Sequence, residues 1–159
     1  MKNIIHKVFP APVSNVFPGY KLALYVFALL TLLTVVRSLI HILAPDGGAQ
    51  SIATIPIDTF ESAARSVIIQ MFSLWGLSQL LMGIVYAVVF FKYQSLIPLM
   101  YILIIIEYSM RIILGNFKPI ETLSTPPGAI GNYIIIPLSI VMLFLALRSP
   151  KEQKRITTT

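Results

Sequence analysis

Four long apolar stretches constrain the fold of this chain more than any other feature. They cover residues 22–43, 59–91, 96–114 and 130–148, and each is long enough for the roughly 20 apolar residues that a helix needs to cross a bilayer. Backbone groups in hydrocarbon must be hydrogen-bonded within the segment, so such stretches form helices. The sequence therefore predicts an all-α integral membrane protein folded as a four-helix bundle.

The composition agrees with this class. Of the 159 residues 57% are hydrophobic and 11% are charged, and the mean hydropathy is +0.85, whereas soluble domains are about half apolar and a quarter charged. We expect residues 1–21 to form a basic N-terminal arm, residues 22–148 the transmembrane domain and residues 149–159 a basic tail. No segment is large enough for a separate soluble catalytic domain, so we expect the function to be carried out in or at the bilayer.

Local signals refine the four stretches. Residues 22–43 are too long for the apolar core of a cleavable signal, so we interpret them as a retained anchor. Asp58 and Glu61 have the spacing of a capping box and predict that the second helix starts near residue 59 and extends beyond the membrane. Pro137 lies inside the fourth stretch and predicts a kink there.

Basic residues are distributed unequally between the two ends of the predicted bundle. Eight lysines and arginines fall on the side of the two termini and two, Arg65 and Lys118, on the other side. Because cytoplasmic loops carry the excess of basic residues, we expect both termini in the cytoplasm, in a bacterial-type inner membrane or a plasma membrane. Basic residues that flank apolar segments do not form a nucleic-acid surface, so we expect no nucleic-acid partner.

Ionisable side chains within the apolar stretches are the candidate site. Arg37 and Arg111 are predicted at one depth near the outer boundary, with Glu107 one turn deeper. His41 and Gln70 are predicted in the same outer layer. A charge that faces lipid costs at least about 2.5 to 3.5 kcal/mol, so the stripes that carry these residues should face each other. We expect Glu107 to pair with Arg111 on its own helix or with Arg37 across the bundle.

Three interpretations of this polar layer remain open at the level of sequence. It fixes the register of the helices, or it lines an outward-facing site for a ligand or substrate, or the arginines reach up to lipid phosphates. Glu107 and His41 together would also suit acid–base chemistry, but their separation is not visible in the sequence. The catalytic residues, if any, are therefore unknown at this stage.

Metal and cofactor chemistry have little support. The chain has no cysteine, which excludes disulfides and thiolate sites. The second histidine, His6, falls in the opposite compartment from His41, so we expect no metal site and no cofactor.

Gly76 and Gly83 lie on one face of the second helix and predict close helix packing, either within the monomer or between copies. Trp75 lies too deep for an interfacial anchor and should fill the bundle or line the cavity.

Short motifs suggest a relationship at the level of the fold. "QMFSLWGL" opens the second helix, "IEYSMR" closes the third and "TPPGAIGNY" leads into the fourth. With this order of elements, residues 22–147 resemble small four-helix membrane proteins of the DoxX-like group, and the layout is similar to the four-helix scaffold that tethers sterol-biosynthetic enzymes. The resemblance implies a fold and, for members linked to redox complexes, an accessory role.

Taken together, these features favour a small multi-pass protein that acts as a non-enzymatic accessory subunit or scaffold. Its partners would be membrane proteins, lipid or an amphipathic small molecule, and a homo-oligomer is a further alternative. The competing hypothesis is a small membrane enzyme or carrier that handles an amphipathic molecule in an outward-facing polar cavity.

Overall fold

The computed structural model describes residues 2–148 and is helical, with no strand among them. Four of its helices are long and apolar enough to cross a membrane. They are α2 (Lys21–Leu43), α3 (Ser62–Lys92), α4 (Ile97–Phe117) and α5 (Pro127–Leu147). The short helix α1 (Lys2–Val8) and the 3₁₀ turns η1 (Ile57–Thr59) and η2 (Gln94–Leu96) complete the elements. The predicted tail, residues 149–159, lies outside the described residues.

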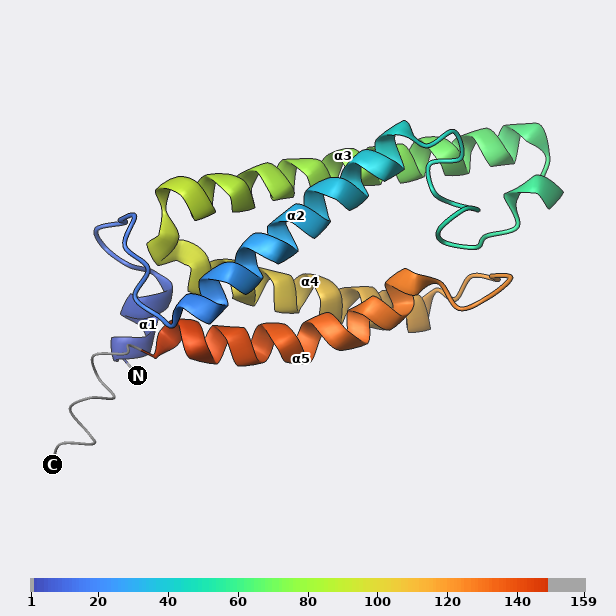
Figure 1. Cartoon of the computed structure of the whole chain (residues 1–159). Helices are drawn as coiled ribbons and strands as arrows, with labels where there is room; N and C mark the ends of the chain where they lie inside the picture. The colour runs from blue at the N-terminus through green and yellow to red at the C-terminus, as the bar shows by residue number, and fades with distance from the viewer. Residues whose placement is uncertain (1, 149–159) are drawn as a thin grey trace, which may run out of the picture.

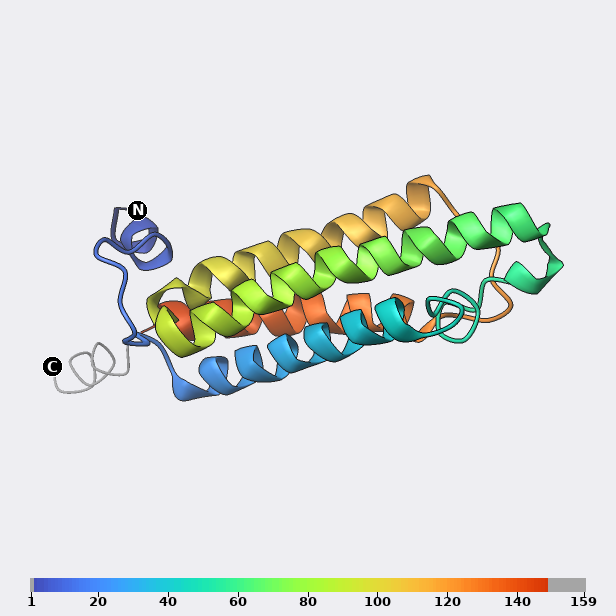
Figure 2. The ribbon, with the colours of Figure 1, turned by 90° about the horizontal axis from the view of Figure 1, so that it is seen from above.

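The four long helices form a bundle in which both described chain ends lie at the same end (Figures 1 and 2). We call this the terminal end, and the opposite end, with the connections 44–61 and 118–126, the loop end. At the terminal end the Lys7 ammonium donates to the Leu147 carbonyl at 3.0 Å. The backbone N–H of Tyr20 donates to the Leu145 carbonyl at 3.1 Å. The arm is therefore tied to the last turn of α5.

Large apolar side chains cover the outside of the bundle on every long helix. Leu29, Leu81, Ile106 and Phe144 are each more than half exposed. Such a surface would be unfavourable in water but is the ordinary surface of helices in hydrocarbon. The exposure pattern therefore agrees with a multi-pass membrane protein.

An aromatic core fills the bundle between its middle and the terminal end. The ring of Phe27 packs edge-on against Tyr86 and Tyr101, with ring centroids 5.6 and 5.8 Å apart. The Tyr101 hydroxyl donates to the Ala23 carbonyl at 2.6 Å. Edge-to-face geometry is the favoured arrangement of aromatic pairs. These contacts hold α2, α3 and α4 together at this end.

The predicted start of the second helix is corrected by the structure. The helix α3 begins at Ser62 instead of residue 59, and Glu61 at its N-cap makes no side-chain capping bond. Asp58 lies in η1 and pairs with Arg65 at 3.0 Å, and its carboxylate also accepts from Gln50. The Asp58 carboxylate therefore binds Arg65 and Gln50 and does not cap the helix. From Ser62 to Lys92 the helix is continuous, as the absence of proline predicts.

Prolines determine where α4 ends and where α5 begins. The helix α4 runs past Gly115 to Phe117 and stops at Lys118, because a residue that precedes proline, here Pro119, disfavours helical geometry. The helix α5 starts at Pro127 instead of residue 130, because proline is well accommodated in the first turn. Pro137 lies within α5, which continues through it to Leu147.

A compact loop covers the loop end beside α3. The Asp46 carboxylate accepts from the backbone N–H groups of Gly48, Gln50 and Ser51 at 2.9, 3.0 and 2.7 Å. Burial alone would raise the pKa of Asp46, but these bonds outweigh it and lower the pKa to about 2. Ala49, Ile55 and Ile57 form a small buried cluster that packs against α3. The loop is therefore part of the folded structure above the candidate site.

Candidate functional site

One buried stripe of α2 carries most of the polar groups that face the bundle. The hydroxyls of Thr31, Thr34 and Ser38 donate to the carbonyls four residues earlier, at 2.6 to 2.9 Å. Their hydrogen-bonding capacity as donors is thus used within the helix. The side chains of Arg37 and His41, on the same stripe, instead bind groups outside α2.

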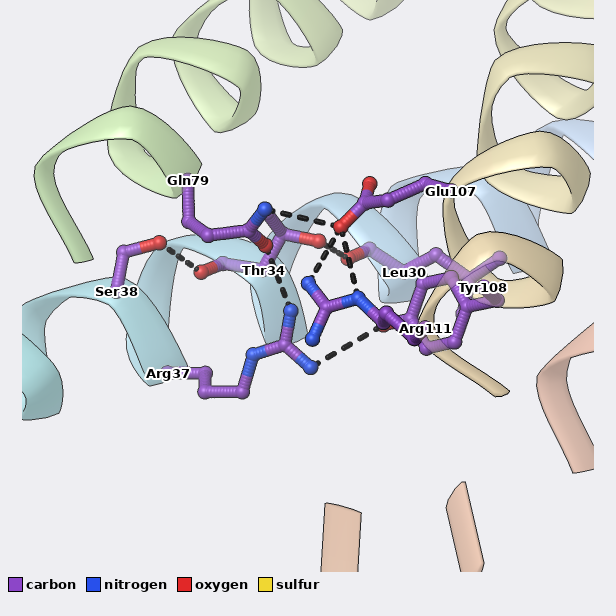
Figure 3. Close-up of polar contacts among 8 residues, drawn as sticks. All are labelled: Leu30, Thr34, Arg37, Ser38, Gln79, Glu107, Tyr108 and Arg111. Carbon is purple, nitrogen blue, oxygen red and sulfur yellow. Dashed lines mark hydrogen bonds and ion pairs between the residues drawn. The ribbon is translucent and has the colours of Figure 1, made fainter. Parts of the chain in front are cut away.

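A chain of hydrogen bonds crosses from α2 through α3 to α4 (Figure 3). An Nη2–H of Arg37 donates to Gln79 Oε1 at 2.7 Å, and Gln79 Nε2 donates to Glu107 Oε1 at 2.9 Å. The same carboxylate oxygen accepts from Arg111 Nε at 3.1 Å and pairs with Arg111 Nη2. Glu107 therefore pairs directly with Arg111, and it reaches Arg37 only through the amide of Gln79.

Two aromatic rings lie against both guanidinium groups. The Cζ atoms of Arg37 and Arg111 lie 5.8 and 5.0 Å from the ring centroid of Trp75. They lie 5.9 and 5.1 Å from that of Tyr108. The Tyr108 hydroxyl also accepts from Arg37 Nη1 at 3.4 Å. The negative faces of aromatic rings attract cations at these distances, so Trp75 and Tyr108 help to hold two like charges together. We call Arg37, Trp75, Gln79, Glu107, Tyr108 and Arg111 the guanidinium cluster.

The guanidinium cluster carries one net positive charge. Glu107 neutralises Arg111, whereas Arg37 forms no ion pair with any carboxylate among residues 2–148. Its Nε–H is buried without a hydrogen-bond partner in that part of the chain. Isolated charge within the membrane is costly, so an unmatched arginine marks a functional candidate.

His41 lies next to the guanidinium cluster but is fixed by the loop. It is 2% exposed, and its Nδ1 lies 2.7 Å from the Gly47 carbonyl oxygen. A carbonyl can only accept, so Nδ1 carries the proton. The imidazole packs against Trp75 in a tilted arrangement, with the ring centroids 4.7 Å apart and the ring planes 42° apart. A Cβ at Gly48, whose φ is +74°, would lie 2.9 Å from the ring, so this position requires glycine.

A cavity of about 470 Å³ opens beside these groups in the loop half of the bundle. Its volume is in the usual range for small-molecule sites. Its polar wall consists of Arg37, His41, Trp75, Tyr108, Arg111 and Asn132. The rest of the wall comes from Leu33, Ile52, Ala53, Phe72, Ile135 and the start of α5 at Pro126, Pro127, Gly128, Ala129 and Gly131.

The cavity reflects how α2 and α5 are arranged. At the terminal end the residues just before α2 touch α5, and a Cβ at Gly19 would lie 2.5 Å from the Ala146 carbonyl oxygen. Toward the loop end the two helices diverge (Figure 1). The cavity lies in this diverging half, where Leu33 and Arg37 of α2 lie across from Gly131 and Ile135 of α5. It is therefore bordered by side chains from all four long helices.

The structure brings together four of the five residues predicted for the polar layer. Arg37, Glu107 and Arg111 belong to one hydrogen-bonded group, and His41 contacts that group through Trp75. Gln70 does not join them, because its side chain is exposed on α3. Glu107 does not line the cavity, so the carboxylate and the imidazole do not form an acid–base pair there.

The sequence did not assign Gln79 and Tyr108 to the site. Gln79 lies between Gly76 and Gly83, on the face of α3 whose glycines predicted close helix packing, and the packing of this face explains its position. A Cβ at Gly76 would lie 2.8 Å from His41 Cβ, and one at Gly83 would lie 2.9 Å from Val35. These two close approaches set the register of α3 on α2 and place Gln79, between them, beside Arg37.

Comparison with protein-family models, with curated proteins and with solved structures finds no match for the chain. Among the described residues, no group of three or more metal-ligating side chains is positioned to hold a metal ion.

Proposed function

We propose that the protein is a multi-pass membrane protein that binds a lipid or another amphipathic molecule in the cavity, as a non-enzymatic accessory subunit or scaffold. The observation that carries the proposal is the mixed wall of the cavity. The wall presents two guanidinium groups, an imidazole and the Asn132 amide, and most of its remaining residues are apolar. An amphipathic molecule has the same division into a polar head and an apolar chain.

A binding role agrees better with the polar groups than a catalytic one. The Glu107 carboxylate is engaged by Arg111 and Gln79. A general base must reach the proton that it removes, and Glu107 does not line the cavity. The polar groups that do line it are two guanidiniums, an imidazole, an amide and two aromatic rings, which can all bind a ligand without reacting with it.

The orientation of the protein belongs to the same proposal. We infer that both termini are cytoplasmic, because eight basic residues lie on their side and two on the other. The cavity, in the loop half of the bundle, would then open on the outer side of a bacterial-type inner membrane or a plasma membrane. The DoxX-like resemblance stays a prediction about the fold.

Two glycines allow a direct test of ligand binding. A Cβ at Gly131 or at Gly115 would meet no atom within 4 Å, so leucine fits the backbone at both sites. Gly131 lines the cavity and Gly115 does not. Native mass spectrometry of the purified protein should show a bound amphiphile on the wild type and on Gly115→Leu, and its loss from Gly131→Leu. A wild type without any bound amphiphile, or equal retention in both variants, would contradict the proposal.

A further inference from the structure

We propose that the ligand of this cavity is an anionic amphiphile, whose carboxylate or phosphate head binds Arg37 and Arg111. This inference rests on the proposed function and adds the charge of the ligand. It starts from the charge balance of the cavity wall. Two guanidiniums line the cavity, whereas the one carboxylate bound to them, Glu107, does not. The surface that a ligand meets is therefore more positive than the guanidinium cluster as a whole.

The guanidiniums also have hydrogen-bonding capacity to spare. Each carries five N–H groups, and four of the resulting ten donate to Tyr108, Gln79 and Glu107. The Nε–H of Arg37 is buried and unpartnered. The remaining N–H groups project from the planar forks that match carboxylate and phosphate oxygens. A neutral head such as an ester would accept some of these bonds but would leave the charge of Arg37 unmatched.

The aromatic rings do not replace an anion. Trp75 and Tyr108 attract both guanidiniums through their faces, but a ring quadrupole carries no net charge. Asp46, the nearest acidic residue along the chain to His41, is held by four hydrogen bonds from its own loop. Glu121 lies against a different pocket at the loop end. None of the carboxylates in the described chain therefore matches Arg37.

The apolar remainder of the wall selects an amphiphile over a free ion. Leu33, Phe72 and Ile135 line the cavity next to the cationic groups. Burial of an apolar chain against them is favourable for each CH₂ group that leaves water. Inorganic phosphate would gain only the charge interaction. We therefore assign the site to a lipid-like anion with its head at the arginines and its chain along α2 and α5.

The binding test uses the full chain in neutral phosphatidylcholine nanodiscs and the fluorescence of Trp75, the only tryptophan and a residue of the cavity wall. The probes are dodecanoate, dodecyl phosphate, methyl dodecanoate and inorganic phosphate. We expect dodecanoate and dodecyl phosphate to bind at least about tenfold more tightly than the ester. Inorganic phosphate should bind weakly and should not displace dodecanoate.

The outcomes separate this inference from the proposed function. Equal affinities for dodecanoate and its methyl ester would overturn the anionic assignment while ligand binding itself stands. Displacement by inorganic phosphate at the same concentration as dodecyl phosphate would overturn the assignment to an amphiphile. Binding of none of the four probes would contradict both.

A matched pair of arginine variants locates the charge. Arg37→Gln should lower the affinity for dodecanoate by about tenfold or more and should lower that for the methyl ester by much less, because the ester loses hydrogen bonds but no charge interaction. Arg65→Gln removes an exposed arginine outside the cavity and should change neither. A loss of ester and carboxylate binding alike in a folded Arg37→Gln protein would contradict the inference. Should that variant not fold, the head-group comparison on the wild type still decides.

Discussion

Glu107 is the residue on which the guanidinium cluster depends. It is 28% exposed and accepts hydrogen bonds from Arg111 and Gln79. Its replacement by glutamine removes the negative charge while two positive charges remain in the membrane interior. The Gln79 amide of α3 connects Glu107 of α4 to Arg37 of α2. A change at the Glu107 carboxylate therefore affects the contacts among three helices.

Substitution of Glu107 should therefore destabilise the protein, and a second change should restore it. Glu107→Gln is expected to cost about 2 kcal/mol of unfolding free energy, because a hydrogen-bonded charge pair is broken and its partner remains. Glu107→Gln combined with Arg111→Met should regain most of the loss, since the direct pair is with Arg111. Thermal unfolding in detergent measures both. Glu121→Gln, an exposed control, should be neutral, and an equal neutrality of Glu107→Gln would contradict this account.

Two buried tyrosines of the aromatic core form a matched pair for a second prediction. The Tyr101 hydroxyl donates to the Ala23 carbonyl, whereas the buried Tyr86 hydroxyl has no partner within the described chain. Tyr101→Phe should cost about 1 kcal/mol of unfolding free energy, and Tyr86→Phe should be neutral or stabilising. Unfolding midpoints of the two variants give the comparison. The reverse order of stability would show that the hydroxyls are not bonded as described.

At the scale of elements, sequence reasoning located the four helices but not all of their ends or contacts. Apolar length alone predicted each span, because hydrocarbon requires helices of that length. The predicted start of α3 was wrong because the Asp58 carboxylate binds Arg65 and Gln50 instead of capping the helix. These tertiary contacts cannot be inferred from the spacing of Asp58 and Glu61. Likewise, Gln79 was missed and Gln70 included because the rotation of α3 is set by Gly76 against α2.

The loop 44–61 gives a prediction about pH. The pKa of Asp46 is lowered from 3.8 to about 2 by its backbone hydrogen bonds, despite the opposing effect of burial. A lowered pKa in the folded state stabilises the loop above pH 3.8, and this contribution is lost as the pH falls toward 2. NMR amide signals of Gly48, Gln50 and Ser51 should therefore shift with a midpoint near 2. A midpoint near 3.8 would contradict the hydrogen-bonded loop, and Asp46→Asn should abolish the transition.

At the scale of the whole molecule, the orientation in the membrane is open to direct measurement. The chain has no cysteine, so single cysteines report without background. Tyr93 and Thr125 are exposed at the terminal and loop ends of the bundle. In intact cells an impermeant thiol reagent should label Thr125→Cys, and Tyr93→Cys should be labelled only after the membrane is opened. The opposite pattern would reverse the proposed orientation, and labelling of both in intact cells would contradict the four-span bundle.

The central claim is that an amphipathic ligand with an anionic head occupies the cavity in the loop half of the bundle. The most direct measurement is a high-resolution density map of the wild-type protein purified in nanodiscs made from the membrane that expresses it. We predict elongated density in the cavity, with its head within hydrogen-bonding distance of Arg37 and Arg111 and its chain along Leu33 and Ile135. A cavity that contains only water, or one closed by α5 packed against α2, would contradict the claim.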